Sequence, residues 1–405
     1  METMDDIHNY RRRLENELKR LQEATDISEK NKKAILDFNN FCFSSGIGRS
    51  KNQRYVFDLK KLARYLNKDF EDCKRQDILN LIAITEQTTY AYNTKRGFRI
   101  VLKKFYKWLR NIEDKGIYPD EVKWITTTSR QENHRLPEEL LTEEDIIKMI
   151  DHAKTPRQKA FVAVLYESGC RVGEILTLKI KNVAFDNLGA KITVFGKTGS
   201  RRVRLVSSES YLKEWLNLHP GKNNPESYLW TKSDGRGKMV SYTQIRLLLK
   251  RNAKRAGILK RINPHSFRHA RASYLANHLT ESQLKEVFGW TQGSKMAAVY
   301  VHLSGRDTDS AILKVYGKKI EEDKPERSLI TPKICTRCKT ENEFTNRFCK
   351  ICGMALDEKE ISQILKQEIE VSDFNKKIGN LTDNPEFLEI LMEKLKSKIR
   401  NEIKK

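Results

Sequence analysis

The chain has 405 residues, of which 38% are hydrophobic, and this length predicts two or three domains. A formal net charge of +23 favours a nucleic acid as partner, with a basic membrane-surface binder or a merely soluble basic protein as the alternatives. No apolar run approaches the ~18 residues that cross a bilayer and the charged N-terminus lacks a secretory signal, so we expect a cytoplasmic protein without membrane contact.

Residues 1–27 form a charged arm. Its apolar residues make at most a narrow helical stripe of Ile7, Leu14, Leu18 and Leu21. Two interpretations stay open: an amphipathic arm that packs on a partner, or a frayed helix.

Residues 28–125 predict a four-helix domain, because apolar residues recur there at helical spacing. Helices are expected from Ser28, from Ser50, over residues 75–85 and over residues 88–109. One face of the last helix is basic and carries Lys95, Arg96, Arg99, Lys103, Lys104 and Lys107. Such a face suits DNA phosphates, whereas on a lone helix it would more often be a solvated surface.

Residues 126–137 are polar and read as a linker. A second domain follows over residues 138–318 and opens with the capping pair Thr142 and Asp145. The next helix starts at Pro156 and ends at Gly169. Arg171 and Glu174 come directly after it. A guanidinium fork fits two phosphate oxygens, although an Arg–Glu pair by itself is more often a surface ion pair.

Residues 191–195 and 202–206 alternate in polarity and predict a β-hairpin. Lys197 lies at its tip between Gly196 and Gly199. A lysine on such a tip can protonate a departing oxygen, though most hairpin lysines are only solvated. Two more helices are expected over residues 207–219 and 241–256.

Residues 263–303 contain the densest set of reactive side chains. His265 and Arg268 share one face of a predicted helix that begins at Pro264. Trp290 and Tyr300 follow. A cation and N–H donors can hold phosphate oxygens while a phenol attacks phosphorus.

The order of these motifs resembles that of the tyrosine recombinases, the phage-integrase and Xer-like family of site-specific recombinases. The residues that carry the resemblance are Arg171-x-x-Glu174, Lys197, His265-x-x-Arg268, Gly289-Trp290 and Tyr300. It implies a mainly α fold with a small antiparallel β-sheet, in which residues 28–125 are a SAM-like core-binding domain and residues 138–318 an α+β catalytic domain. It also implies a recombinase or integrase that cuts and rejoins double-stranded DNA through a 3′-phosphotyrosyl intermediate, as a homotetramer, without ATP or a catalytic metal.

The resemblance further implies a role for each residue. Tyr300 is the nucleophile, Arg171 and Arg268 hold the non-bridging oxygens, His265 assists proton transfer and binds the phosphate, Trp290 donates its indole N–H, and Lys197 protonates the leaving 5′ oxygen. Two features depart from the family pattern. Position 290 is Trp where many relatives have His, and the interval to Tyr300 is one residue longer, so the loop of residues 291–295 must absorb a rotation of ~100°.

Three rival functions follow from the same residues. A type IB topoisomerase would use the same chemistry, with strand rotation in place of exchange. A catalytically inactive DNA-binding regulator would keep the basic surfaces alone. A zinc-ribbon transcription factor is disfavoured because the Cys-containing segment is a small part of the chain.

After a linker at residues 319–333, the pairs Cys335-x-x-Cys338 and Cys349-x-x-Cys352 predict a structural Zn²⁺ ribbon over residues 334–355, rather than a redox pair. The ribbon has either DNA or a neighbouring subunit as its partner. The tail, residues 356–405, carries two apolar helical stripes, for which we expect a helix–helix contact between subunits.

Overall fold

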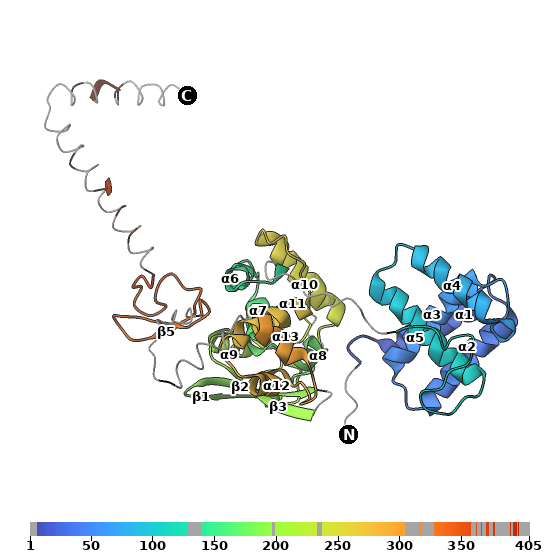
Figure 1. Cartoon of the computed structure of the whole chain (residues 1–405). Coiled ribbons are helices and arrows are strands. Elements are labelled where there is room, and N and C mark those ends of the chain that lie inside the picture. The colour runs from blue at the N-terminus through green and yellow to red at the C-terminus, as the bar shows by residue number, and fades with distance from the viewer. Residues whose placement is uncertain are drawn as a thin grey trace. The chain divides into compact units, whose positions relative to one another are not determined.

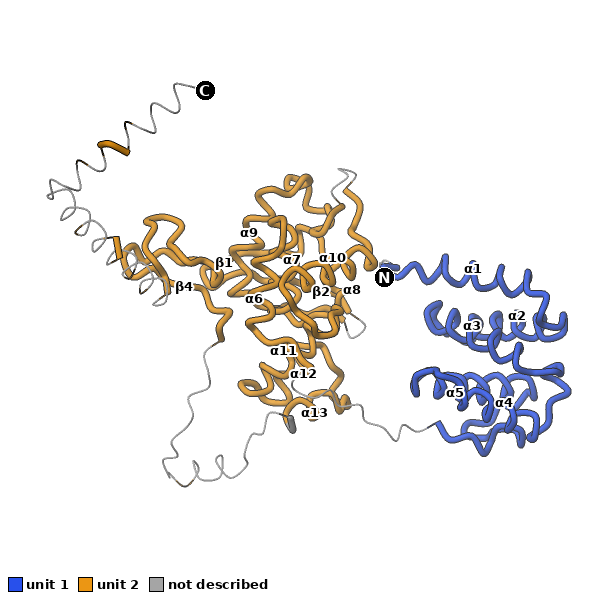
Figure 2. Tube along the Cα trace, turned by 90° about the horizontal axis from the view of Figure 1, so that it is seen from above, with its two compact units in different colours: residues 1–136 blue, residues 137–405 orange. Residues whose placement is uncertain are grey.

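The computed structural model describes residues 6–127, 139–196, 199–232, 237–303, 316 and 328–357, together with a few isolated positions of the tail. The chain divides into two compact units, residues 1–136 and 137–405 (Figure 2). Helices dominate both, and a small antiparallel sheet lies in the second, which confirms the predicted fold class. Within the described residues, no helix is both long and apolar enough to cross a bilayer.

The first unit is a bundle of helices (Figure 1). Its core is rich in aromatic side chains. Phe105 packs edge-on against Phe38 and Phe70, with ring centroids 5.2 and 4.8 Å apart. The elements are α1 (Tyr10–Gln22), α2 (Glu29–Ser44), α3 (Arg49–Tyr65), the 3₁₀ turn η1 (Phe70–Asp72), α4 (Arg75–Gln87) and α5 (Tyr92–Leu109). The four predicted helices are present, and α5 begins later than expected because residues 88–91 are not helical.

Helix α1 packs inside the first unit. Leu14 and Leu21 are buried in its core, and Glu17 forms a buried ion pair with Lys60 of α3 at 2.5 Å. The sequence left open whether this segment packs on a partner or frays. The narrow stripe suffices because α3 supplies both an apolar surface and a cation for Glu17.

The second unit is built around helix α7, which packs against α6, α9, α11 and the sheet (Figure 1). Its last nine residues, 160–168, are all buried. The helices are α6 (Glu143–Asp151), α7 (Pro156–Ser168), α8 (Val172–Leu176), the 3₁₀ turn η3 (Ile180–Asn182), α9 (Glu209–Asn217), α10 (Tyr242–Arg255), α11 (Pro264–Ala276), α12 (Glu281–Phe288) and α13 (Met296–Leu303). The predicted capping box of Thr142 and Asp145 is present at the start of α6.

The sheet has the strand order β1-β2-β3 and is antiparallel throughout. Its strands are β1 (Val183–Asp186), β2 (Gly189–Gly196) and β3 (Gly199–Leu205). The predicted hairpin is β2–β3, in which Gly196 pairs with Gly199. Strand β1 was not predicted, because its four residues are too few to establish an alternating pattern.

The Cys-containing segment packs on the second unit through its own side chains. It contains β4 (Lys333–Ile334) and β5 (Glu341–Asn342). Phe344 is buried against the ring of Tyr211 on α9, with centroids 5.4 Å apart, and Thr345 shares a hydrogen bond with the Tyr211 hydroxyl. The segment therefore belongs to the body of this unit. The residues of the two predicted tail stripes lie outside the described residues.

Candidate active site

Helix α11 brings three reactive side chains to one place. Its start is fixed by Asn263, whose side chain accepts a hydrogen bond from Ser266 N, and by Pro264 in the first turn. His265 is exposed on that turn, whereas Arg268 is only 7% exposed. His269 follows directly, one turn beyond His265, and the two imidazole centroids are 6.5 Å apart.

The Arg268 guanidinium is fixed by two main-chain oxygens. Nη1 donates to Gly169 O at 2.8 Å and Nη2 to Phe288 O at 2.7 Å, and the group also lies over the Trp290 ring. Burial and the nearby charge of Arg171 lower the pKa of Arg268 to about 10. The cation is thus held where an anion would relieve an unfavourable concentration of positive charge.

Arg171 is the N-cap residue of α8 and is braced by Glu174. Its main-chain N–H and its Nη1 each donate to the Glu174 carboxylate at 2.9 Å. Glu174 is 2% exposed, whereas the Arg171 side chain keeps 35% of its surface accessible. Burial raises the pKa of Glu174, but hydrogen bonds from Arg201 and Arg171 outweigh this effect and hold it below the ordinary value.

Arg201 of β3 is the second partner of Glu174, and the sequence analysis did not identify it. Nη1 and Nη2 donate to the two carboxylate oxygens at 3.2 and 2.8 Å, and Nε donates to Val287 O at 3.0 Å. This one side chain connects the hairpin, the Arg171 segment and the end of α12. Three guanidinium groups (Arg171, Arg201 and Arg268) therefore surround a single carboxylate, which leaves the cluster cationic.

The hairpin tip is held close to the same carboxylate. A Cβ atom on Gly196 would lie 2.5 Å from Glu174 Oε1, so only glycine permits this approach. Lys197 is the next residue and lies outside the described residues.

Tyr300 of α13 closes the site from the other side. Its ring stacks on Trp290 with an interplanar angle of 3° and centroids 5.7 Å apart, and the residue is 5% exposed. Residues 291–295 connect the two, and the stacking of Tyr300 on Trp290 is kept across this interval. The Tyr300 hydroxyl shares a short hydrogen bond with His269 Nδ1. That His265 assists proton transfer from Tyr300 stays a prediction.

Two residues of this cluster were missed, and each left a signal in the sequence. Arg201 alternates with Val203 and Leu205, both buried, so the hairpin pattern puts a charged residue on the core side of β3. A cation there needs a buried partner. His269 lies four residues after His265, and this spacing places both imidazoles on one helix face.

The Cys-containing segment has the geometry of a tetrathiolate metal site. The Sγ atoms of Cys335, Cys338, Cys349 and Cys352 all lie within 4.8 Å of one another. Buried Asn342 supports them: its Nδ2 approaches Cys349 Sγ at 3.7 Å and its Oδ1 accepts from Lys350 N at 2.9 Å. Four thiolates at this separation fit Zn²⁺.

The helical scaffold, the arginine cluster and the stacked, buried Tyr300 all lie in a segment that is similar to a known protein family. Residues 139–306 match the family model described as the phage integrase family.

The chain is also similar to curated relatives and to solved structures. The tyrosine recombinase XerD of Ralstonia nicotianae is 25% identical over 274 residues, which cover 64% of this chain and 85% of the relative. The tyrosine recombinase XerA of Pyrococcus horikoshii is 26% identical over 234 residues, which cover 56% of this chain and 75% of the relative. The post-cleavage complex of the XerH recombinase with palindromic difH DNA has a TM-score of 0.54 at 21% identity, over 78% of this chain and 99% of that one. A lambda integrase tetramer bound to a Holliday junction has a TM-score of 0.52 at 18% identity, over 68% of this chain and 79% of that one.

Proposed function

We propose that this chain cuts and rejoins double-stranded DNA through a covalent bond between Tyr300 and a 3′ phosphate. The phenolic oxygen attacks phosphorus, the 5′ oxygen leaves with a proton from Lys197, and the 5′ hydroxyl of a second strand reverses the reaction. One phosphoester replaces another of similar energy, so neither ATP nor a catalytic metal is needed.

The observation that carries the proposal is the proximity of Arg171 to Arg268, and of Arg268 to the Trp290–Tyr300 stack. Arg268 contacts the Trp290 ring, and Tyr300 stacks on that ring. Excess positive charge fixed before substrate arrives suits a phosphorane-like transition state, whose non-bridging oxygens gain charge. In this arrangement the exposed His265 donates to the phosphate and Trp290 contributes its indole N–H.

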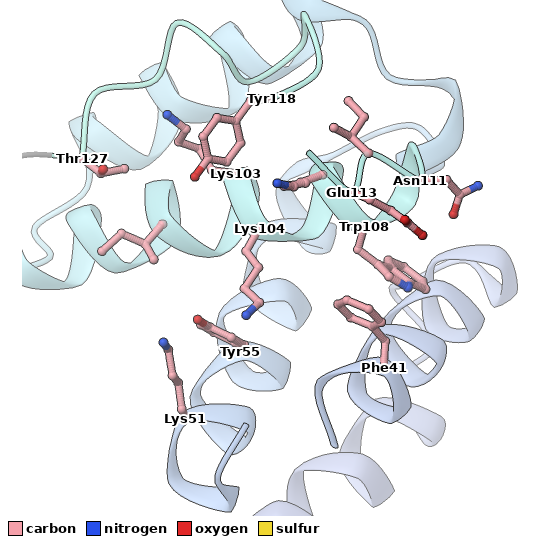
Figure 3. A pocket seen from close by; sticks show the side chains of 13 residues that line it. Phe41, Lys51, Tyr55, Lys103, Lys104, Trp108, Asn111, Glu113, Tyr118 and Thr127 are labelled. Atoms are coloured by element: carbon pink, nitrogen blue, oxygen red, sulfur yellow. The ribbon is translucent and has the colours of Figure 1, made fainter. Parts of the chain in front are cut away.

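We assign DNA binding by the first unit to a hollow of about 720 Å³ between α3 and α5 (Figure 3). Lys51 and Lys104 lie over the Tyr55 ring, at 5.7 and 5.9 Å, while Lys103 lies over Tyr118 at 4.1 Å. Burial and the charge of Lys51 lower the pKa of Lys104. Like charges held together at some cost to the free protein are suited to phosphate groups of a duplex.

The basic face of α5 is thereby divided into two parts. Arg99 forms an ion pair with Glu86 at 2.7 Å, and Lys95 donates to Glu86 O at 2.5 Å. These cations stabilise the contact between α4 and α5. Lys103, Lys104 and Lys107 line the hollow, and they are the ones that we assign to DNA. Lys103 also donates to Ile125 O at 3.1 Å and Lys107 to Asp114 O.

Two further assignments concern assembly and the metal. The lambda integrase likeness supports a homotetramer on DNA, and access to DNA supports a cytoplasmic location. The four Cys residues are assigned to a structural Zn²⁺ that holds the ribbon over residues 334–355, since four protein ligands leave no open coordination position.

A covalent adduct tests the reaction. Tyr300→Phe keeps the stacking on Trp290 but has no nucleophile, so it can be used to select a bound duplex from a random library. A nicked version of that duplex loses the short 5′ strand after cleavage and traps the wild-type adduct. We expect a DNA-linked band with wild type and none with Tyr300→Phe.

Other outcomes identify the rivals. A selected duplex that never forms an adduct identifies an inactive DNA-binding regulator. An adduct with relaxation of supercoiled plasmid, but without joining of strands from two duplexes, identifies a type IB topoisomerase.

A further inference from the structure

The hydroxyl of Tyr300 is hydrogen-bonded to an imidazole that has no role in the proposed reaction. His269 Nδ1 and Tyr300 Oη share the bond, with ring centroids 6.0 Å apart at 40°. The pair is sheltered, because Tyr300 is 5% exposed and His269 is half-buried. The stacked Trp290 ring fixes the phenol, while helix α11 fixes the imidazole.

The chemistry of the site calls for a base at this position. A phenol has a pKa near ~10 and is a poor nucleophile until its proton is removed. Arg171 and Arg268 are cations that cannot accept a proton. A neutral imidazole can, and a general base must lie within hydrogen-bond reach of the proton that it takes. His269 meets this condition when it carries its own proton on Nε2.

We propose that His269 is a catalytic residue, the proton acceptor for Tyr300. The inference rests on the function proposed above. As Tyr300 Oη attacks, its O–H bond breaks and the proton passes to Nδ1. The electron pair of that bond forms the O–P bond, and the 5′ oxygen leaves with a proton from another group. On rejoining, the imidazolium of His269 returns its proton to the departing phenolate.

This assignment separates the two histidines of α11. His265 is exposed on the first turn and is left to the phosphate, while His269 lies one turn deeper beside the phenol. An imidazole that served only to pack Tyr300 would be replaceable by any side chain of similar shape and hydrogen-bonding capacity.

The test uses His269→Asn, which places an amide near the position of Nδ1 and keeps a hydrogen bond without accepting a proton. Single-turnover adduct formation on the nicked duplex should slow by about 100- to 10,000-fold, the range of general-base contributions, at unchanged DNA affinity. His278→Asn is the control, because His278 is exposed in the turn that follows α11. A His269→Asn rate equal to wild type overturns the proposal.

Two modified reactants distinguish a base from a structural residue. A duplex with sulfur in place of the bridging 5′ oxygen releases a thiolate that needs no proton, so it should rescue Lys197→Ala and leave His269→Asn slow. A fluorinated tyrosine at position 300 has a more acidic phenol and should narrow the gap between His269→Asn and wild type at least tenfold. Rescue by sulfur, or an unchanged gap with the fluorinated residue, overturns the role of His269.

Two controls separate the role of His269 from the proposed function on which it rests. If wild type forms no adduct, or Tyr300→Phe still forms one, the proposed function fails before His269 is in question. Where His269→Asn lowers the melting temperature, His269→Gln takes its place, and wild-type rates with that variant also overturn the role.

Discussion

Arg201 Nε donates to Val287 O at 3.0 Å, which joins the β2–β3 hairpin to the helix that leads into Trp290. The same guanidinium holds both oxygens of Glu174. The hairpin, the Arg171 brace and the α12–α13 loop thus share one support, although 86 residues separate Arg201 from Val287.

Arg201→Met should therefore impair the whole site. It leaves the Glu174 carboxylate, 2% exposed, with one of its two cationic partners, and loss of one partner from a buried ion pair costs about 3–5 kcal/mol. Urea unfolding measures this loss, and adduct formation should fall because Glu174, which braces Arg171, is no longer fixed by Arg201. Arg202→Met is the control, since Arg202 is exposed on the opposite face of β3. Equal stability of the two variants would show that Arg201 gives no net support.

Gly289→Ala should disturb the support from the other end. Gly289 ends α12 with φ +59°, and a Cβ there would lie 2.8 Å from Arg201 Nη1. The left-handed conformation costs a non-glycine residue about 1–2 kcal/mol, and Arg201 must move as well. We expect a lower melting temperature together with slower cleavage.

Gly293→Ala provides the matched control in the same loop. A Cβ at Gly293 would meet open space. It should leave both the melting temperature and the adduct rate close to wild type, and a similar loss in the two variants would point to loop flexibility as the cause.

The sequence predicted what local chemistry determines. Helix starts were identified from local signals, the cap at Thr142 and the first-turn Pro264, because these act within a few residues of themselves. The site motifs were identified from their order along the chain. Contacts between residues that are distant in sequence were not, since the partners of Arg201 and His269 become apparent only when β3 and α13 are packed against their neighbours.

The same limit explains the N-terminal arm. Its stripe looked too narrow for a core helix because the partner of Glu17, Lys60, lies 43 residues away. Lys197 and the segment after Leu303 stay predictions from the sequence.

Lys51→Ala/Lys104→Ala tests the DNA contact of the first unit. Each phosphate contact contributes about one unit to the slope of log affinity against log salt, so the double variant should reduce that slope by about two. Stability should hold or rise, because these charges repel each other in the free protein. Lys33→Ala, exposed on α2 and outside the hollow, should leave the slope unchanged. An unchanged slope in the double variant places the DNA elsewhere.

Asp58 predicts an unusual pH dependence of stability. Burial raises its pKa to about 6; Oδ2 accepts from Arg54, and Oδ1 is buried without a hydrogen-bond partner among the described residues. An Asp in the unfolded chain has a pKa of about 4. Between that pH and the raised pKa of about 6, the folded state binds more protons than the unfolded state, so stability rises as pH falls through this window. Relative to Asp58→Asn, the wild type should gain roughly 2–3 kcal/mol from pH 8 to pH 4. A flat difference in urea unfolding would contradict the raised pKa.

Zinc removal should loosen the ribbon and the helix on which it packs. Cys349→Ser deletes one thiolate, and a structural Zn²⁺ contributes its binding energy to folding. Hydrogen–deuterium exchange should then rise over residues 328–357 and over α9, because Phe344 and Thr345 no longer cover Tyr211. Helix α11 packs against α7, α12 and α13 and should keep its protection. Cys42→Ser, in the core of the first unit, should retain the metal by elemental analysis. The four thiols hold no metal if the purified wild-type protein contains no zinc and shows the same hydrogen–deuterium exchange as Cys349→Ser.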